Sequence, residues 1–174
     1  YNETLSIQKS IDLIGEPGAI IDASGTEGES PISAAIVIGH SDESLPIIDG
    51  AEVSGFEIIG NLYTMSGIQI HPVSHNIDIK NNVIHGMQSP NPGSAVTPSY
   101  GILSFGQSAN FRPDNVIISN NEIYNILGLG ISFGSYSNNA TVEGNHIHDI
   151  IPNDLDLSIG VNAQFSSNLT VSNN

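Results

Sequence analysis

The chain has 174 residues, of which 39% are hydrophobic and 12% charged, and its 3 Lys+Arg against 18 Asp+Glu give a formal net charge of −15. This length can bury one core, but three cations cannot neutralise a nucleic-acid backbone or an anionic membrane surface. Cysteine is absent, which excludes disulfides and thiolate metal sites, and no apolar run approaches the roughly 18 residues of a membrane span.

Short alternating segments, rather than helical stripes, run along the chain. Ile occurs 27 times against 10 for Leu, and Asn occurs 19 times. Branched residues favour strands, whereas Asn and Gly favour turns. Apolar and polar residues alternate in the segments 5–7, 68–70, 77–79 and 102–104. These segments predict short strands with one buried face.

Two short segments recur in a fixed order. The first reads apolar-x-[Gly/Asn]-x, often with Asn last, and its copies are 13–16, 53–56, 79–82, 118–121, 142–145 and 171–174. The second begins with Gly or Ala and an aliphatic residue, and its copies are 35–38, 67–70, 101–104, 130–133 and 160–163. Positions 15, 55, 81, 120, 144 and 173 of the first segment are 40, 26, 39, 24 and 29 residues apart. A fixed pair of strands with variable connections predicts a solenoid whose turns accept insertions.

Four segments of the chain are similar in sequence to the repeats of one family, and these are residues 5–16, 76–84, 115–123 and 140–147. The chain resembles the right-handed parallel β-helix of the pectate-lyase-like superfamily, and especially its periplasmic copper-binding-like and its carbohydrate-binding and sugar-hydrolase domains. The resemblance implies an all-β solenoid of about six coils, formed by residues 1–174 as a single domain. Because the sequence stops within a copy of the repeat, we expect it to be a fragment of a longer rod.

Alternation within the repeats predicts where side chains point. The last Asn of each repeat is expected to form an internal ladder made of Asn82, Asn121, Asn145 and Asn174, since each amide can bond the next coil. Two outward columns follow on the next strand, the first made of Val83, Glu122 and His146 and the second of His85, Tyr124 and His148.

These outward columns hold the side chains best suited to chemistry. We expect hydrogen-bond contact between Glu122 and His146 and between Tyr124 and His148 on adjacent coils. A carboxylate beside an imidazole favours acid–base catalysis, and the trio His146, His148 and Glu122 is a candidate metal site. The candidate carbohydrate contacts are His85, Tyr124, His148 and Tyr100. The competing interpretation is a solvated ladder of stacked side chains.

Arg112 is the cation most open to a functional role. It lies in the insertion 105–115, which we expect to form a groove with the insertion 86–99 over the strand 100–104. The lyases of this superfamily pair Arg or Lys with calcium-binding acids, yet no Asp cluster is expected beside Lys80. The hydrolases need paired carboxylates, and the chain has no Asp-Asp pair. Weak calcium sites are expected near Asp149, Asp154 and Asp156.

Three N-glycosylation sequons begin at Asn2, Asn139 and Asn168. With the acidity and the absence of cysteine, they favour a secreted or cell-surface protein. The leading functional hypothesis is a structural, assembly or carbohydrate-binding module whose partners are a polysaccharide or neighbouring protein chains, including copies of itself. The alternative is a polysaccharide lyase, hydrolase or epimerase whose catalytic candidates are Arg112, Glu122, Tyr124 and His148.

Overall fold

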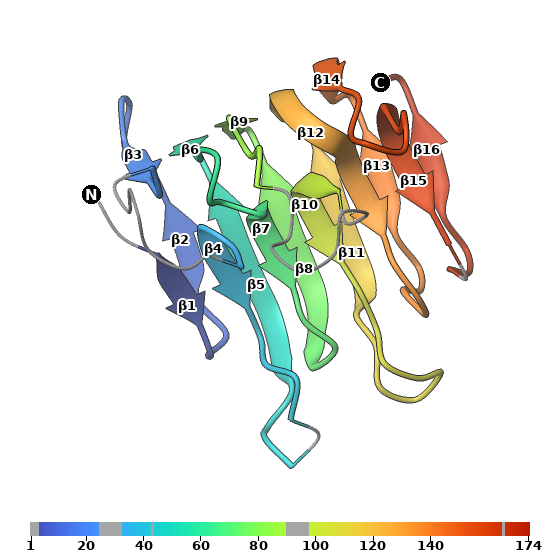
Figure 1. Ribbon diagram of the computed structural model, residues 1–174. Helices are drawn as coiled ribbons and strands as arrows, with labels where there is room; N and C mark the ends of the chain where they lie inside the picture. Colours follow the sequence, from blue (N-terminus) through green and yellow to red (C-terminus); the bar gives the residue numbers. More distant parts are fainter. Residues whose placement is uncertain (1–3, 25–32, 43, 90–97, 165) are drawn as a thin grey trace.

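The computed structural model describes residues 4–24, 33–42, 44–89, 98–164 and 166–174. Over these residues all strand pairs are parallel, and successive coils follow one another along a rod, with the two termini toward opposite ends (Figure 1). Each coil contributes strands to three faces. None of the described segments forms a helix of the length and hydropathy that a membrane crossing requires.

The strands of each face stack in sequence order. Face A contains β1 (Leu5–Ile7), β4 (Ile36–Ile38), β7 (Ser66–Ile70), β10 (Ser99–Ser104), the second half of β12 (Glu122–Phe133) and β15 (Ile159–Ala163). Face B contains β2 (Asp12–Ile14), β5 (Ile48–Ser54), β8 (Ser74–Lys80), β11 (Asp114–Ser119), β13 (Thr141–Glu143) and β16 (Thr170–Ser172). Face C contains β3 (Ile20–Asp22), β6 (Glu57–Ile59), β9 (Val83–His85), the first half of β12 and β14 (His146–Ile151).

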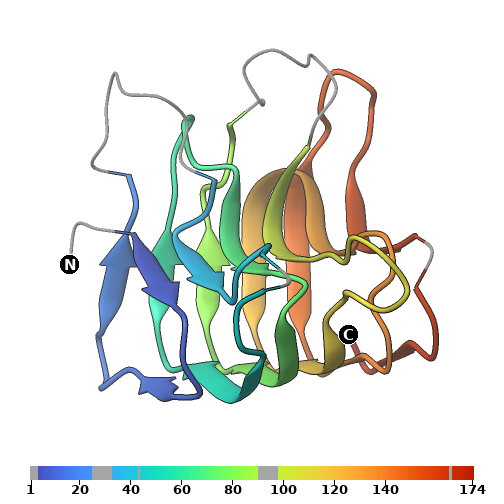
Figure 2. The same ribbon diagram turned by 90° about the horizontal axis from the view of Figure 1, so that it is seen from below.

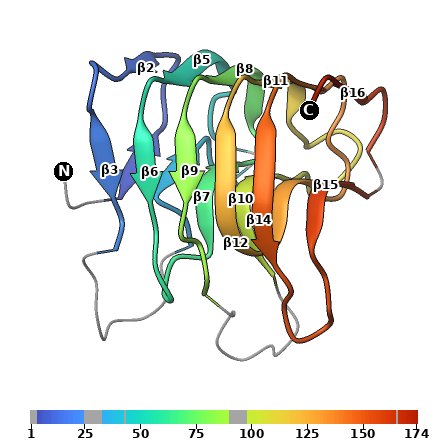
Figure 3. The ribbon, with the colours of Figure 1, turned by 90° about the horizontal axis from the view of Figure 1, so that it is seen from above.

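This arrangement confirms the predicted all-β parallel solenoid of about six coils. When the rod is turned, the strands of a face lie side by side along it (Figure 2). Figure 3 shows face C as the row from β3 to β14. The long strand β12 turns a corner, so it pairs with β9 and β14 on face C and with β10 and β15 on face A.

Branched aliphatic side chains fill the interior of the rod. Ile residues of all three faces are fully buried, among them Ile36, Ile68, Ile77, Ile79, Ile84, Ile102, Ile118, Ile123 and Ile131. A single coil could not shield these positions, but in-register stacking about 4.8 Å apart buries each one against its equivalents above and below. Stability therefore depends on contacts between coils.

A column of glycines explains why the second repeat begins with Gly. A Cβ atom on Gly101 would lie 2.6 Å from the carbonyl oxygen of Gly130 and 2.5 Å from Cγ2 of Ile123. A Cβ atom on Gly67 would in the same way be too close to the Gly101 carbonyl oxygen and to Ile84. One on Gly130 would be too close to the Gly160 carbonyl oxygen and to Ile147. The close approach of face A to the isoleucines of face C leaves no room for a side chain at this position.

The predicted internal asparagine ladder is present. Asn82, Asn121 and Asn145 are at most 2% exposed. In each rung the Nδ2 group donates to the Oδ1 atom of the next rung, at 3.1 Å from Asn82 to Asn121 and 3.0 Å from Asn121 to Asn145, and Asn174 continues the column at 2.8 Å. Each Oδ1 also accepts from the backbone N–H of the preceding rung. The ladder thus satisfies backbone groups at a corner where no strand pairing is available.

The structure also contains a second, exposed asparagine ladder that was not predicted from the sequence. Its members are Asn76, Asn115, Asn139 and Asn168, each with a positive φ between 50° and 55°. Asn115 donates from Nδ2 to Asn76, and Asn168 donates to Asn139 at 3.0 Å. Each member lies six positions before a rung of the internal ladder, as in 76 and 82 or 115 and 121. That constant spacing is the sequence signal, because Asn tolerates the left-handed conformation required at or near the start of β8, β11, β13 and β16.

Candidate functional site

The outward columns of face C are in the predicted register. Glu122 pairs with Val83 and His146, and Tyr124 pairs with His85 and His148. Ile123 between them is fully buried, so its neighbours along β12 project from the rod. The fold therefore gathers the predicted side chains of three coils on one surface.

The rings of the second column stack face to face along the rod. The centroids of His85 and Tyr124 are 4.7 Å apart with planes 9° from parallel, and those of Tyr124 and His148 are 5.2 Å apart at 10°. The hydrogen bond expected between Tyr124 and His148 is therefore replaced by ring stacking, because the strand spacing matches the stacking distance of aromatic rings. Both faces of Tyr124 are covered, which leaves its edge for a ligand.

Carboxylates reach the imidazoles diagonally rather than straight across. Glu57 Oε1 lies 3.0 Å from Nε2 of His85, and Glu122 Oε1 lies 3.3 Å from Nε2 of His148. The expected partner of Glu122 was His146, but Glu122 Oε1 and His146 Nδ1 are 3.9 Å apart, beyond hydrogen-bond distance. A glutamate side chain is long enough to span the diagonal to a residue two positions further on, where the ring edge faces it.

His148 is the most constrained of these side chains. Its Nδ1 atom lies 2.9 Å from Asp149 Oδ2, and its ring stacks on His146 with centroids 4.3 Å apart. The hydrogen bond with Asp149, followed by that with Glu122, raises the pKa of His148 above its usual value. The ring is therefore held between two carboxylates and two neighbouring rings.

The metal-candidate trio comes together in space. One donor atom each from Glu122, His146 and His148 lies within 4.8 Å of the others. The calcium candidates Asp149, Asp154 and Asp156 form no comparable group of three donors among the described residues. Nitrogen-rich donors suit transition metals, whereas calcium requires several oxygen ligands.

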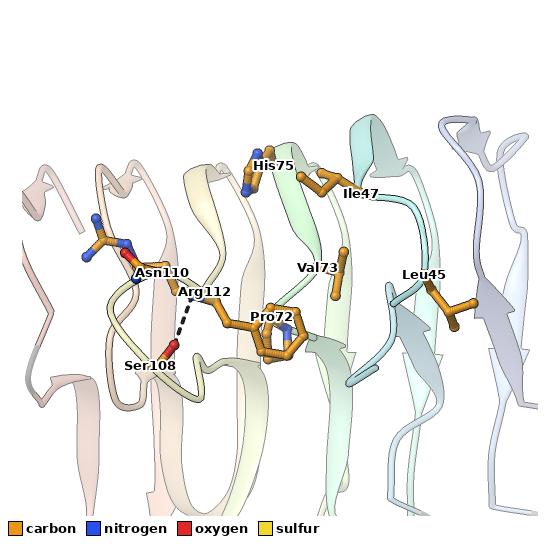
Figure 4. A pocket seen from close by; sticks show the side chains of 9 residues that line it. Leu45, Ile47, Pro72, Val73, His75, Ser108, Asn110 and Arg112 are labelled. Atoms are coloured by element: carbon orange, nitrogen blue, oxygen red, sulfur yellow. Dashed lines mark hydrogen bonds between the residues drawn. The ribbon is translucent and has the colours of Figure 1, made fainter. Parts of the chain in front are cut away.

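A hollow of about 390 Å³ opens at the corner between faces A and B. Its lining residues come from three segments of successive coils and are Leu45, Ile47, Pro72, Val73, His75, Ser108, Asn110, Phe111 and Arg112 (Figure 4). The wall at 108–112 is the predicted one, and its turn is fixed by the backbone N–H of Phe111 donating to Ser108 Oγ at 3.1 Å.

The opposite wall of this hollow differs from the prediction. This wall comes from residues 45–47 and 72–75. The expected wall, residues 86–99, precedes β10 and so lies at the opposite end of that strand from residues 108–112. Residues 90–97 of this segment lie outside the described part of the chain. Turns at one corner of a solenoid lie side by side along the rod, which is why successive turns, rather than the two ends of one strand, enclose the space.

The remaining candidates lie apart from these two places. Tyr100 is on face A, where burial raises the pKa of its phenol, and not with the rings of face C. Lys80 on face B pairs with Glu52 at 2.7 Å, and Asp12, Glu52 and Asp78 all raise its pKa, with the hydrogen bond to Glu52 the largest cause. The acidic surroundings of Lys80 correct the expectation that no such residues lie beside it.

Asn139 and Asn168, two of the three glycosylation candidates, are exposed as expected. Asn139 and Asn168 belong to the exposed ladder, where the Nδ2 group of Asn139 donates to Asp114 at 2.8 Å. Asn2 lies outside the described residues. Glycosylation stays a prediction, and attachment of a sugar at Nδ2 would replace one ladder hydrogen bond with a bulky substituent.

Comparison with known protein families agrees with this geometry. Residues 66–174 match the family described as the right handed beta helix region. The chain belongs to this right-handed β-helix family. The matched part contains all the side chains of the metal-candidate trio and the 108–112 wall of the corner hollow. No curated protein and no solved structure matches the chain.

Proposed function

We propose that this right-handed β-helix is a carbohydrate-binding module of a secreted or cell-surface protein, and that the sugar occupies the corner hollow. The observation that carries the proposal is the composition of the lining. An aromatic ring and aliphatic side chains lie beside a few convergent polar groups, and that mixture suits the apolar faces and hydroxyl groups of sugars.

Charge favours an uncharged ligand. The chain carries a formal charge of −15, and Arg112 is the only Lys or Arg among the described residues that line the hollow. A polyanionic chain would be repelled by the surrounding surface, whereas a neutral polysaccharide would not. The guanidinium then serves as a hydrogen-bond donor to hydroxyl oxygens.

Binding without turnover is favoured over the alternative of a polysaccharide-active enzyme. Glycoside hydrolysis needs two carboxyl groups flanking the scissile bond. The described lining residues contain no Asp or Glu, and the Glu122–His148 pair lies on face C, away from the corner between faces A and B. Both ring faces of Tyr124 are covered, so this tyrosine offers no open aromatic platform either.

The test is affinity electrophoresis and calorimetry against neutral and acidic polysaccharides. We expect at least one neutral glucan, mannan or galactan to bind. Phe111→Ala and Arg112→Ala should each weaken that binding by at least about tenfold, since they remove central contacts of the hollow. Leu62→Ala is the matched control, because Leu62 is 62% exposed and lies outside the lining.

Two results would overturn the proposal. The first is a failure of the chain to bind any polysaccharide on the panel. The second is release of reducing or unsaturated ends that Arg112→Ala abolishes, which would establish the enzymatic alternative instead.

A further inference from the structure

The structure assigns a second, independent site on face C: we propose that Glu122, His146 and His148 bind one divalent transition-metal ion of the Zn²⁺ class. The two histidines come from β14 and the glutamate from β12, so both elements belong to the stacked body of the rod. The proposal does not depend on carbohydrate binding, since the corner hollow shares none of these residues.

The separation of the donor atoms is the first argument. Zinc binds histidine nitrogen and carboxylate oxygen at about 2.0–2.2 Å, so neighbouring ligands of a tetrahedral ion lie roughly 3.4 Å apart. Glu122 Oε1 lies 3.3 Å from His148 Nε2 and 3.9 Å from His146 Nδ1. The third pair of donors, on His146 and His148, also lies within 4.8 Å, so rotation of the exposed His146 ring about its side-chain bonds would bring all three donors around one ion.

Orientation of the His148 ring is the second argument. A metal-bound histidine usually donates its other ring N–H to a carboxylate, which fixes the tautomer and the direction of the ring. Asp149 occupies that position, with Oδ2 2.9 Å from Nδ1 of His148, so Nε2 faces Glu122. Stacking against Tyr124 on one coil and against His146 restrains the ring further.

Exposure of the trio is compatible with ion entry. The side chain of His146 is 73% exposed, that of Glu122 46% and that of His148 32%. Three protein ligands leave one position of a tetrahedral ion for water or an external group. The donor set of two nitrogens and one oxygen favours zinc, copper or nickel over calcium and magnesium.

The test is calorimetric titration of metal-free protein with Zn²⁺ alone, with Ca²⁺ as the comparison ion. We expect one Zn²⁺ to bind per chain and Ca²⁺ to bind far more weakly. His148→Phe removes a ligand but keeps a ring stacked on Tyr124. His146→Ala and Glu122→Gln remove the other two ligands. Each of the three variants should weaken Zn²⁺ binding by more than the roughly 10–100-fold that is expected when only a residue supporting a ligand is changed.

Two further variants separate a metal site from a general effect on the surface. His85→Phe is the matched control, because it makes the same change at the other end of the ring ladder and should leave Zn²⁺ affinity unchanged. Asp149→Asn should weaken binding by an intermediate factor, since Asn tolerates the positive φ of 50° at this position but lacks the charge. Circular dichroism confirms that each variant is folded.

The proposal is overturned if wild-type protein binds no Zn²⁺, if folded His148→Phe binds it with unchanged affinity, or if His85→Phe loses as much affinity as His148→Phe. In each case Glu122, His146 and His148 are an ordinary surface ion-pair cluster. Loss of polysaccharide binding in the earlier experiment leaves this result unaffected, so the two proposals fail separately.

Discussion

Replacing Asn121 with alanine would remove the middle rung of the internal ladder. Its Oδ1 atom accepts from the backbone N–H of Asn82 at 3.0 Å and from Nδ2 of Asn82 at 3.1 Å. Its Nδ2 group donates to the carbonyl of Ile79 and to Oδ1 of Asn145, both at 3.0 Å. The side chain is 1% exposed, so water cannot replace these four bonds without entering the core.

The magnitude follows from the groups left without partners. The Asn82 N–H loses its acceptor inside the rod, and a buried polar group without a partner costs about 1–3 kcal/mol. The Ile79 carbonyl and the Asn82 amide each lose one further hydrogen bond, worth about 0.5–1.5 kcal/mol. The N–H of residue 121 still donates to the side-chain Oδ1 of Asn145, because residue 121 contributes only its backbone to that bond. We therefore expect Asn121→Ala to lower the free energy of unfolding by roughly 2–5 kcal/mol.

Urea unfolding followed by circular dichroism measures this loss, and Asn115→Gly supplies the comparison. Asn115 belongs to the exposed ladder at a φ of 55°, a conformation that glycine adopts without strain. Its loss should cost no more than about 1 kcal/mol. Equal losses for the two variants, or a loss below about 1 kcal/mol for Asn121→Ala, would refute the claim that the internal ladder satisfies buried backbone groups.

Two further predictions concern the glycine column and the face C cluster. Gly101→Ala should destabilise the rod by more than about 2 kcal/mol in the same unfolding assay. The reason is that the new Cβ atom would lie 2.5 Å from Cγ2 of Ile123 and 2.6 Å from the carbonyl oxygen of Gly130. An unchanged unfolding midpoint would show that the coils can separate at no cost. An NMR titration should give His148 a pKa above the ordinary value of about 6.5, and Asp149→Asn should lower it, because the bond to Asp149 is the largest cause of the shift. Since the folded pKa is the higher one, the stabilisation from protonated His148 is fully present below about pH 6.5 and is lost as pH rises through the folded pKa; an identical titration in the variant would contradict the assigned cause.

Much of the fold could be predicted from the residues because each coil repeats the same constraints. Gly101 and Asn121 stand at fixed places in their segments for steric and hydrogen-bonding reasons that recur in four successive coils. Alternation around Ile123 placed Glu122 and Tyr124 on the outer surface in the correct columns. These inferences need only the period of a strand and an in-register stack.

The contacts within those columns could not be predicted in the same way. The strand register places His146 directly opposite Glu122. The glutamate side chain is long enough to reach diagonally, however, so Glu122 Oε1 lies nearer to His148 Nε2, at 3.3 Å, than to His146 Nδ1, at 3.9 Å. The role of Asp149 was hidden as well, because a neighbour in sequence on a strand normally projects to the opposite side. A positive φ of 50° at Asp149 brings its carboxylate to His148 instead.

The amino-acid sequence is sufficient to predict the architecture, because its repeated glycine, asparagine and isoleucine positions are typical of stacked coils of parallel strands. It also determined which side chains share an outer face. Two features became visible only in the folded chain: the turns at 45–47, 72–75 and 108–112 enclose one hollow, and Asp149 orients the ring of His148. The physical reason is that strand periodicity is local and repeats, whereas the paths of inserted turns and the directions of long side chains depend on what neighbouring coils place beside them.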